Sequence, residues 1–229
     1  MKQSTVKTNN QESPLKAVIF DYDGVLINSR DIGLKAYQAI AQHFGVTGYT
    51  SLKEFQSDQK RKYKNILHEW GATTPELVKH AETIYRAVHE EHHKNLSEIP
   101  GMRKVLDTLS KKYTIALVSG TYRAIIESGL KNNNMLHYFK HIIGADDVKN
   151  VKPEPDGLLL SLQKLGIQPH EAMYVGDMVI DIQMGRAAKV KTAILTSHSW
   201  NALDDLKAQN PDLLIEHPDH LLQHLGELT

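Results

Sequence analysis

The chain has 229 residues, which is long enough for one large domain, or for a core with a small insertion, and for a substantial buried interior. Its 27 Lys and Arg residues balance its 27 Asp and Glu residues, so the overall charge gives no indication of nucleic acid as a partner. The absence of cysteine excludes disulfides, thiolate metal sites and cysteine nucleophiles, and agrees with a cytoplasmic location. No apolar run approaches membrane-spanning length, so we expect no membrane association.

The N-terminal region predicts a tail followed by a buried strand. Residues 1–13 are polar and lack the apolar stretch of a signal peptide, so we expect a disordered tail. The apolar strand Ala17–Phe20 runs directly into the acidic turn Asp21-Tyr22-Asp23-Gly24. Carboxylates at such a strand end can hold a divalent cation and can attack or protonate a substrate. Asp and Gly also favour ordinary surface turns, so this motif alone leaves both interpretations open.

An all-helical segment is expected next, with no strand between Ser29 and about Asn95. Its first helix ends at Gly45 and carries apolar residues at helical spacing, namely Leu34, Tyr37, Ile40, Ala41 and Phe44. A second helical stretch covers about Ser51–Trp70. A third begins at Thr74-Pro75-Glu76, where Thr suits the cap and Pro the first turn, and continues to about His93.

Strands and helices alternate after the break at Ile99-Pro100-Gly101. The predicted strands are Tyr113–Val118, His141–Ile143, Ala172–Val175, Thr192–Leu195 and Leu213–Ile215. The predicted helices are a helix through Val105–Leu109 and then about Tyr122–Asn132, Pro155–Leu165, Ile180–Ala188, Trp200–Gln209 and Pro218–Leu225. This alternation predicts an α/β fold with a doubly wound parallel sheet. We therefore expect a core made of residues 14–28 and 98–229, interrupted by a helical insertion over residues 29–97.

Polar side chains directly follow three of the buried strands. They are Asp21 and Asp23, Ser119, and Asp177. Because the carboxyl ends of parallel strands meet at one rim of the sheet, these distant residues are expected to become neighbours. Lys152 lies in a Pro-bounded segment before a helix, from which its ammonium can reach the same rim. Asp181 follows Asp177 by four residues, at the start of a predicted helix.

Taken in order, these motifs resemble the four motifs of the haloacid dehalogenase (HAD) superfamily of hydrolases. The matching positions are Asp21-Tyr22-Asp23-Gly24, Ser119, Lys152 and Gly176-Asp177-x-x-x-Asp181, and the resemblance covers about Ala17–Leu225. It points to subfamily IA, in which a helical C1 cap follows the first strand of a Rossmann-like core. The chain departs from many relatives at Asn28-Ser29, where they have Asp-Ser, and at Lys189, where they have Gly.

The resemblance implies a role for each motif residue. Asp21 would be the nucleophile that forms an aspartyl phosphate, Asp23 the general acid and then base, and Lys152 the cation that stabilises the nucleophile and the phosphoryl group. Asp177 would bind Mg²⁺ together with the Asp21 carboxylate and the Asp23 carbonyl oxygen. Ser119 and the Gly120 amide would donate to phosphoryl oxygens, although Ser119 can also cap the following helix. Three roles are open for Asp181: a metal ligand that acts through a water molecule, a partner that orients Lys152, or an acidic residue that is favoured at this position only by the helix dipole.

The acid at position 23 decides between the chemistries of the superfamily. Dehalogenases and phosphonate-cleaving relatives lack it, so its presence favours phosphate-ester or anhydride hydrolysis. We expect a Mg²⁺-dependent phosphatase of the phosphoglycolate-phosphatase-like branch, acting on a small phosphorylated metabolite as a monomer or homodimer. The alternatives are a phosphosugar mutase of the β-phosphoglucomutase type and a non-catalytic binding protein on the same scaffold.

Three features of the helical insertion allow more than one interpretation. The basic run Lys60–Lys64 can bind a second anionic group of the substrate, but a solvated helix face is the simpler interpretation. Tyr63 and Trp70 are expected to pack inside the insertion rather than stack on a ligand. His89 and His93 have the spacing of a zinc pair, yet no third ligand is identifiable, so we expect surface histidines.

Overall fold

The computed structural model describes residues 14–58, 63–93 and 96–227; the predicted tail, Met1–Ser13, lies outside this part of the chain. Its centre is a six-stranded parallel sheet in the order β3-β2-β1-β4-β5-β6. The strands are β1 (Ala17–Phe20), β2 (Thr114–Val118), β3 (Ile142–Ile143), β4 (Ala172–Gly176), β5 (Lys191–Leu195) and β6 (Leu213–Ile215). The predicted doubly wound α/β core is thereby confirmed.

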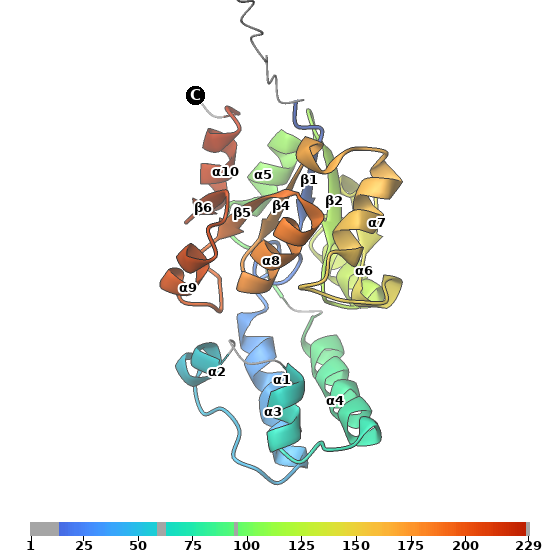
Figure 1. Cartoon of the computed structure of the whole chain (residues 1–229), viewed down its shortest axis with the longest axis vertical. Helices are drawn as coiled ribbons and strands as arrows, with labels where there is room; N and C mark the ends of the chain where they lie inside the picture. The colour runs from blue at the N-terminus through green and yellow to red at the C-terminus, as the bar shows by residue number, and fades with distance from the viewer. Residues whose placement is uncertain (1–13, 59–62, 94–95, 228–229) are drawn as a thin grey trace, which may run out of the picture.

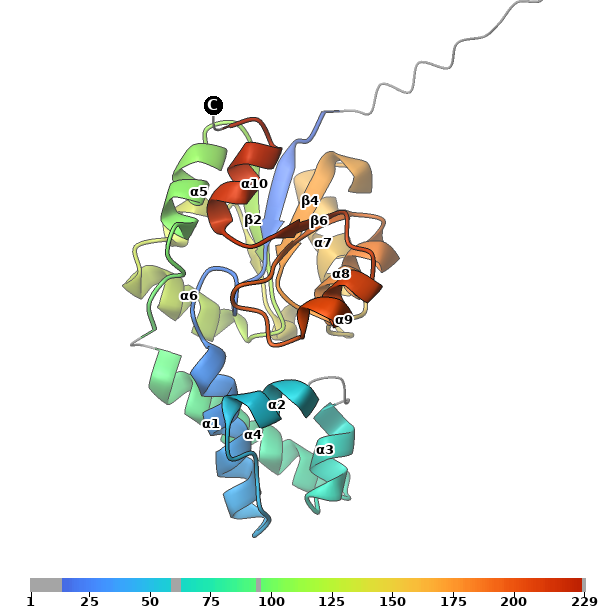
Figure 2. The same ribbon diagram turned by 90° about the vertical axis from the view of Figure 1, so that its left-hand side faces the viewer.

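Helices cover both faces of this sheet (Figure 2). They are α5 (Met102–Leu109), α6 (Arg123–Asn132), α7 (Asp156–Leu165), α8 (Val179–Ala188), α9 (Leu203–Ala208) and α10 (Pro218–His224). Because side chains alternate along a strand, Val18 and Phe20 of β1 pack with α5, α6 and α10, whereas Ile19 packs with α7 and α8. Both faces of β1 are buried, which explains its uninterrupted apolar run.

Four helices form a separate helical block beside the carboxyl ends of the strands (Figure 1). They are α1 (Arg30–His43), α2 (Leu52–Asp58), α3 (Tyr63–Glu69) and α4 (Pro75–His93). The ring of Tyr37 is central to the block, with the rings of Tyr49, Phe55, Tyr63, Trp70 and Tyr85 at centroid distances of 5.1–6.2 Å. Trp70 packs inside the insertion as expected, and Tyr63 packs there too but also lines the cavity described below. None of the described helices is both long enough and apolar enough to cross a bilayer.

The chain enters and leaves the helical block through two adjacent segments. The amide of Asn28 donates to the carbonyl oxygen of Ser97 at 3.0 Å, and the amide of Ile99 donates to the carbonyl oxygen of Leu26 at 2.8 Å. The block is therefore attached to the core by a paired connection directly after the Asp21–Gly24 turn.

Two helix predictions differ from the structure. The stretch expected over Ser51–Trp70 is present as α2 and α3, on either side of residues 59–62, which lie outside the described residues. The helix expected from Trp200 begins only at Leu203. The residues before Leu203 make tertiary contacts instead of helical ones. The Asn201 side chain accepts a hydrogen bond from the amide of Val179 at 2.9 Å, and the Trp200 and Phe55 rings pack with their centroids 5.2 Å apart.

Candidate active site

Asp21 follows the last residue of the central strand β1 and is almost fully buried. Its backbone continues the sheet, since its amide donates to the carbonyl oxygen of Val175 at 2.8 Å. Its Oδ2 atom forms an ion pair with Lys152 Nζ at 2.6 Å, and its Oδ1 atom accepts the amide of Tyr22 at 2.7 Å. The Asp21 carboxylate is thus held at the rim of the sheet with a buried cation beside it.

Asp181 fixes the other side of the Lys152 ammonium. Its Oδ1 atom lies 2.8 Å from Lys152 Nζ, and its Oδ2 atom accepts the amides of Asp177 and Met178 at 3.0 and 2.9 Å. The hydroxyl of Tyr174, which also donates to the carbonyl oxygen of Val118 at 3.0 Å, lies 3.4 Å from Oδ1. Both oxygens of Asp181 are therefore occupied, in an arrangement that orients Lys152 and caps α8 at the same time.

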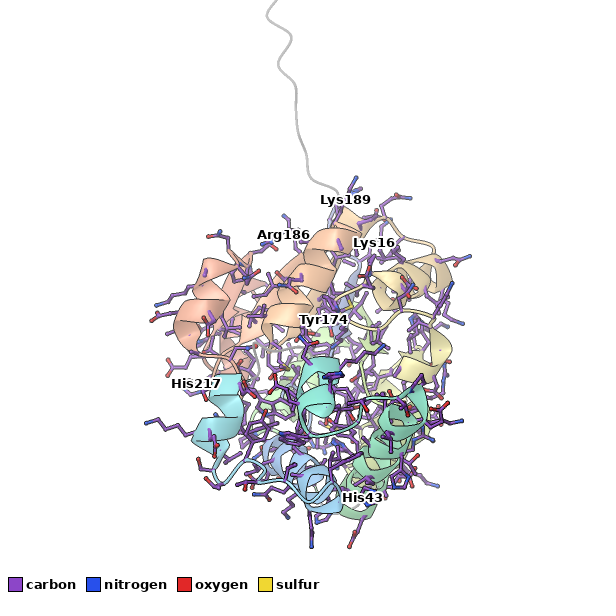
Figure 3. The ribbon with its side chains drawn as sticks, turned by 60° about the horizontal axis from the view of Figure 1, so that its bottom comes forward. Lys16, His43, Tyr174, Arg186, Lys189 and His217 are labelled. Carbon is purple, nitrogen blue, oxygen red and sulfur yellow. The ribbon has the colours of Figure 1, made fainter. Side chains whose placement is uncertain are left out.

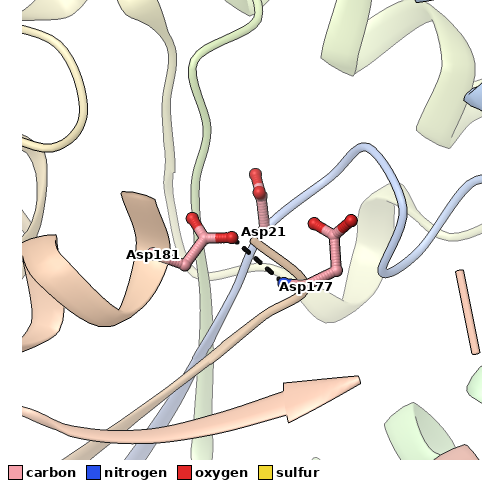
Figure 4. Close-up of side chains that lie close together, drawn as sticks. All are labelled: Asp21, Asp177 and Asp181. Atoms are coloured by element: carbon pink, nitrogen blue, oxygen red, sulfur yellow. Dashed lines mark hydrogen bonds between the residues drawn. The ribbon is translucent and has the colours of Figure 1, made fainter. Parts of the chain in front are cut away.

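Asp177 completes a group of three buried carboxylates, shown in Figure 4. One ligand oxygen from each of Asp21, Asp177 and Asp181 lies within 4.8 Å of the others. Gly24, at φ +72°, faces this group, and a Cβ atom there would lie only 2.4 Å from Asp177 Oδ2. A larger residue at position 24 would therefore push the carboxylate out of place.

The charges of this group do not balance. Burial and the neighbouring carboxylates of Asp181 and Asp23 raise the pKa of Asp21 to about 7, although the Lys152 ammonium acts to lower it. Burial, Asp181 and Asp21 raise the pKa of Asp177 well above its ordinary value. Burial opposes the charge of Lys152, but Asp181 and Asp21 outweigh it and raise the pKa of Lys152. Three buried carboxylates thus share one ammonium, a shortage of positive charge that a bound cation would correct.

The residues present fit a hard divalent cation. Within the described part of the chain, the Asp177 carboxylate accepts no hydrogen bond and forms no ion pair, although it is 2% exposed. Buried carboxylates are paired or coordinate metals, and oxygen ligands suit Mg²⁺. Asp21 and Asp177 therefore have the chemistry of metal ligands, whereas the oxygens of Asp181 are already engaged.

The loop after β2 joins the acidic turn at the same rim. Thr121 Oγ1 donates to Asp23 Oδ2, and the amide of Thr121 donates to Ser119 Oγ at 3.3 Å. Ser119 does not cap α6, because that helix begins at Arg123 and has no side-chain cap. Sequence reasoning did not single out Thr121, and its only signal was its position directly after Ser119-Gly120.

A cavity of about 440 Å³ opens between the sheet rim and the helical block. Six of the seven predicted site residues line it, namely Asp21, Asp23, Ser119, Gly120, Lys152 and Asp177. Its outer wall comes from α1, α3 and α4 and from Trp200 and Tyr122. The structure thus brings the strand-end residues together at the floor of one chamber, and places Asp181 just outside its lining.

The predictions for the helical block have mixed outcomes. His89 is 3% exposed and its ring stacks on Tyr85 at 4.3 Å, so the expected surface position of His89 is wrong. Its side chain faces the chamber because α4 forms part of the wall. The only cluster with metal-ligand geometry among the described residues is the aspartate group, which does not include His89. In the basic run Lys60–Lys64, residues 60–62 lie outside the described residues, and Lys64 is exposed.

Known proteins match this chain over most of its length. The family model described as haloacid dehalogenase-like hydrolase matches residues 18–195. The pyrophosphatase PpaX of Bacillus pumilus is 31% identical over 227 residues, covering 94% of this chain and 98% of that protein.

Solved structures of similar architecture cover the chain equally well. A predicted phosphoglycolate phosphatase from Haemophilus somnus superposes with a TM-score of 0.79 at 19% identity, over 93% of this chain and 98% of that one. A provisionally assigned β-phosphoglucomutase from Thermotoga maritima gives a TM-score of 0.68 at 25% identity, over 94% of this chain and 100% of that one. These structures share the fold, while their names differ in the reaction that they indicate.

Proposed function

This chain belongs to the haloacid dehalogenase-like hydrolase family and is a phosphatase of that family, and from this premise we propose that it is a Mg²⁺-dependent enzyme that hydrolyses a small phosphorylated metabolite. The observation that carries the proposal is the placement of Asp21, paired with Lys152 at 2.6 Å and beside the unpaired Asp177 carboxylate, on the floor of a chamber. The phosphoglycolate-like class of phosphomonoester is the expected substrate.

In the proposed reaction Asp21 attacks the phosphorus atom of the substrate. A bond forms between its carboxylate oxygen and phosphorus while the bond to the leaving oxygen breaks, which gives an aspartyl phosphate. Asp23, held by Thr121, gives a proton to the leaving oxygen and then takes one from the water that hydrolyses the intermediate. Lys152, held between Asp21 and Asp181, keeps a fixed positive charge beside the oxygens that change charge during both steps.

The remaining rim residues would bind the cation and the phosphoryl group. Asp21 and Asp177, together with the backbone carbonyl of Asp23, would hold Mg²⁺, which offsets the repulsion between a carboxylate and a phosphate dianion when it is bound. Ser119 and the amide of Gly120 would donate hydrogen bonds to the phosphoryl oxygens. Asp181 acts through Lys152 as a positioning residue in this scheme.

We also propose a division of the chain into two domains. Residues 14–28 and 98–229 would form the catalytic core, and residues 29–97 a cap that covers the chamber and excludes water. The paired connection at Asn28 and Ser97 supports this boundary, since the chain passes from the core into the helical block and back through the two segments that meet there. Whether the enzyme is a monomer or a homodimer stays a prediction.

The test is phosphate release from a panel of phosphorylated metabolites with Mg²⁺ or with a chelator. We expect release with Mg²⁺ and a loss of at least about 1000-fold in the Asp21→Asn variant, because the amide is a far weaker nucleophile. Unchanged release by Asp21→Asn, or full activity with chelator, would contradict the proposal.

The same panel distinguishes the two alternatives. A phosphosugar mutase, the reaction named for the relative from Thermotoga maritima, would interconvert hexose phosphate isomers faster than it releases phosphate. A binding protein without catalysis would bind members of the panel and release no phosphate from any of them.

A further inference from the structure

The chamber extends well beyond the space that a phosphoryl group needs. Its volume of about 440 Å³ lies in the range of pockets that hold a whole small organic molecule. The wall opposite the carboxylates is aromatic, with Tyr37, Tyr63 and Tyr85 from the helical block. Burial raises the pKa of Tyr63 and of Tyr85 above the ordinary value, so both phenols stay neutral. These three tyrosines therefore add no charge to the part of the chamber that would hold the leaving group of the substrate.

Two cations line the chamber among the described residues, and they differ in what they already bind. Lys152 is neutralised by Asp21 and Asp181. Arg86, on α4, forms no ion pair within the described part of the chain; the residue is exposed and lines the chamber. The positive charge of Arg86 is thus available to an anion that enters from solvent.

Tyr122 holds the Arg86 guanidinium over the active-site rim. Arg86 Nη2 donates to the Tyr122 hydroxyl at 2.9 Å, and Arg86 Cζ lies 4.2 Å from the centre of the Tyr122 ring. Tyr122 directly follows Ser119-Gly120-Thr121, the loop proposed to bind the phosphoryl group. A guanidinium stacked on a ring keeps further N–H donors in its plane, where they can bind a carboxylate or phosphate through two parallel hydrogen bonds.

Glu82 restricts where an anion can bind in this wall. It lies one turn before Arg86 on α4 and lines the same chamber, but forms no ion pair with Arg86. Its negative charge repels an anion from the rest of the α4 surface. Of the lysine and arginine residues on α4, only Arg86 lines the chamber, so its guanidinium is the point on this helix where an anionic leaving group can be bound.

We propose that Arg86 is a specificity-determining residue that binds a second anionic group, a carboxylate or a phosphate, on the leaving group of the substrate. The inference rests on the proposed function and deepens it, because it names the class of substrate as a phosphomonoester or anhydride that carries a second negative charge. Tyr122 positions the guanidinium, and the aromatic wall packs on the atoms between the two anionic groups.

The test compares substrates that differ in one charge. Phosphoglycolate and 2-hydroxyethyl phosphate have nearly the same size, but only the first carries a carboxylate, and diphosphate provides the arm with a second phosphate. The kcat/KM value is measured for all three with the wild-type enzyme and with Arg86→Met, Arg86→Lys and Lys79→Met. Lys79 is the matched control, because it is an exposed cation on α4, two turns before Arg86, and does not line the chamber.

We expect wild type to prefer at least one of the two anionic leaving groups over 2-hydroxyethyl phosphate. In Arg86→Met this preference falls about 10-fold or more, chiefly through KM, as expected for a lost charge-assisted hydrogen bond. Arg86→Lys keeps part of the preference, and Lys79→Met keeps all of it. If Arg86→Met loses the preference for phosphoglycolate, the second anionic group is a carboxylate; if it loses the preference for diphosphate, the second group is a phosphate.

The outcomes separate this inference from the proposed function. Turnover of 2-hydroxyethyl phosphate at the wild-type rate shows that a variant is folded and that its phosphatase chemistry is intact. A preference that falls less than about threefold in Arg86→Met, or that falls equally in Lys79→Met, overturns the role of Arg86 while the phosphatase stands. A wild-type enzyme without any preference for the anionic leaving groups also overturns it. If wild type releases phosphate from none of the three substrates or the wider panel, the proposed function itself fails.

Discussion

Asp23 shows how a single side chain gains its position from a distant part of the chain. Its carboxylate accepts the hydroxyl of Thr121, which lies 98 residues further along, and both residues line the chamber. In the proposed reaction, this contact would hold the Asp23 carboxyl group where it can reach the leaving oxygen, as general acid catalysis needs. Asp21 is held differently, by the backbone of Tyr22 and by Lys152. The two carboxyl groups of one turn are therefore held by separate contacts, in keeping with separate roles.

The role of Asp23 predicts a loss of activity that depends on the leaving group. In Asp23→Asn, kcat should fall about 100- to 10,000-fold for an alkyl phosphate, whose leaving oxygen needs a proton. With p-nitrophenyl phosphate the first step should survive, because nitrophenolate leaves without a proton, while hydrolysis of the aspartyl phosphate slows. Rapid-quench kinetics should then show a burst of nitrophenolate and an accumulated phosphoenzyme.

Two variants control that experiment. Asp21→Asn should give no burst, because no phosphoenzyme can form. Thr121→Val removes the donor to Asp23 and keeps its carboxyl group, so it should weaken both steps less than Asp23→Asn. Equal losses of Asp23→Asn with the alkyl and the nitrophenyl substrates would rule out the acid role.

At the scale of elements, the local sequence predicts most strands and helices because each has a strong pattern of its own. The strand β4 and the helix α8 are examples, since a short apolar run ends at Gly176 and helical spacing starts after it. The N-terminal end of α9 was mispredicted because Trp200 and Asn201 make tertiary contacts with Phe55 and Val179. No local pattern encodes a contact with a helix that lies far away in the sequence.

The end of α8 carries a local strain that the sequence also indicates. Lys189 follows the last residue of the helix with φ 59° and ψ 31°, the left-handed conformation in which Gly is usual. Its side chain is exposed at the edge of the core, and Figure 3 shows Lys189 and Arg186 far from His43 of the helical block.

Lys189→Gly should therefore stabilise the protein. We expect the free energy of unfolding to rise by about 0.5–1 kcal/mol, because relief of the left-handed strain exceeds the added entropy of the unfolded chain. Chemical denaturation measures this change. Lys35→Gly is the matched control, since Lys35 is an exposed lysine inside α1 and glycine there should lower stability by about 1 kcal/mol. A loss of stability in Lys189→Gly would contradict the assignment of strain.

At the scale of the whole molecule, the active site depends on the meeting of the core with the helical block. The strand-end residues were predictable, because a parallel sheet brings the ends of β1, β2 and β4 to one rim whatever covers them. The contact of Arg86 with Tyr122 was not predictable from the sequence. It depends on how α4 lies against the core, which is set by the connection at Asn28 and Ser97 and by the packing of Trp200.

The buried carboxylates also make the stability of the whole fold depend on pH and on metal. Without metal, the pKa of Asp21 is about 7 in the folded protein against an ordinary 3.8, and the pKa of Asp177 is also raised. A raised folded pKa means that the folded state binds more protons than the unfolded state, so these groups lower the free energy of unfolding as pH rises from about 4 to about 7. The proposed Mg²⁺ would bind their ionised forms and should reverse this loss.

The Asp177→Asn variant isolates the contribution of Asp177 to the pH dependence of stability from those of the other titrating groups. One of these is His141, whose pKa is lowered by burial, so that it raises the free energy of unfolding as pH rises toward 6.5. With chelator, the variant should become more stable relative to wild type as pH rises, because the raised pKa of Asp177 means that wild type loses stability as this carboxyl group ionises. With Mg²⁺ at about 100 times its Kd, wild type should gain about 2.7 kcal/mol, or roughly 5–10 °C in Tm, and the variant should gain much less. If Mg²⁺ raised the Tm of both proteins equally, the ion would bind at a site that does not include Asp177. If the difference in free energy of unfolding between variant and wild type did not change with pH, Asp177 would stay ionised in the folded protein without metal.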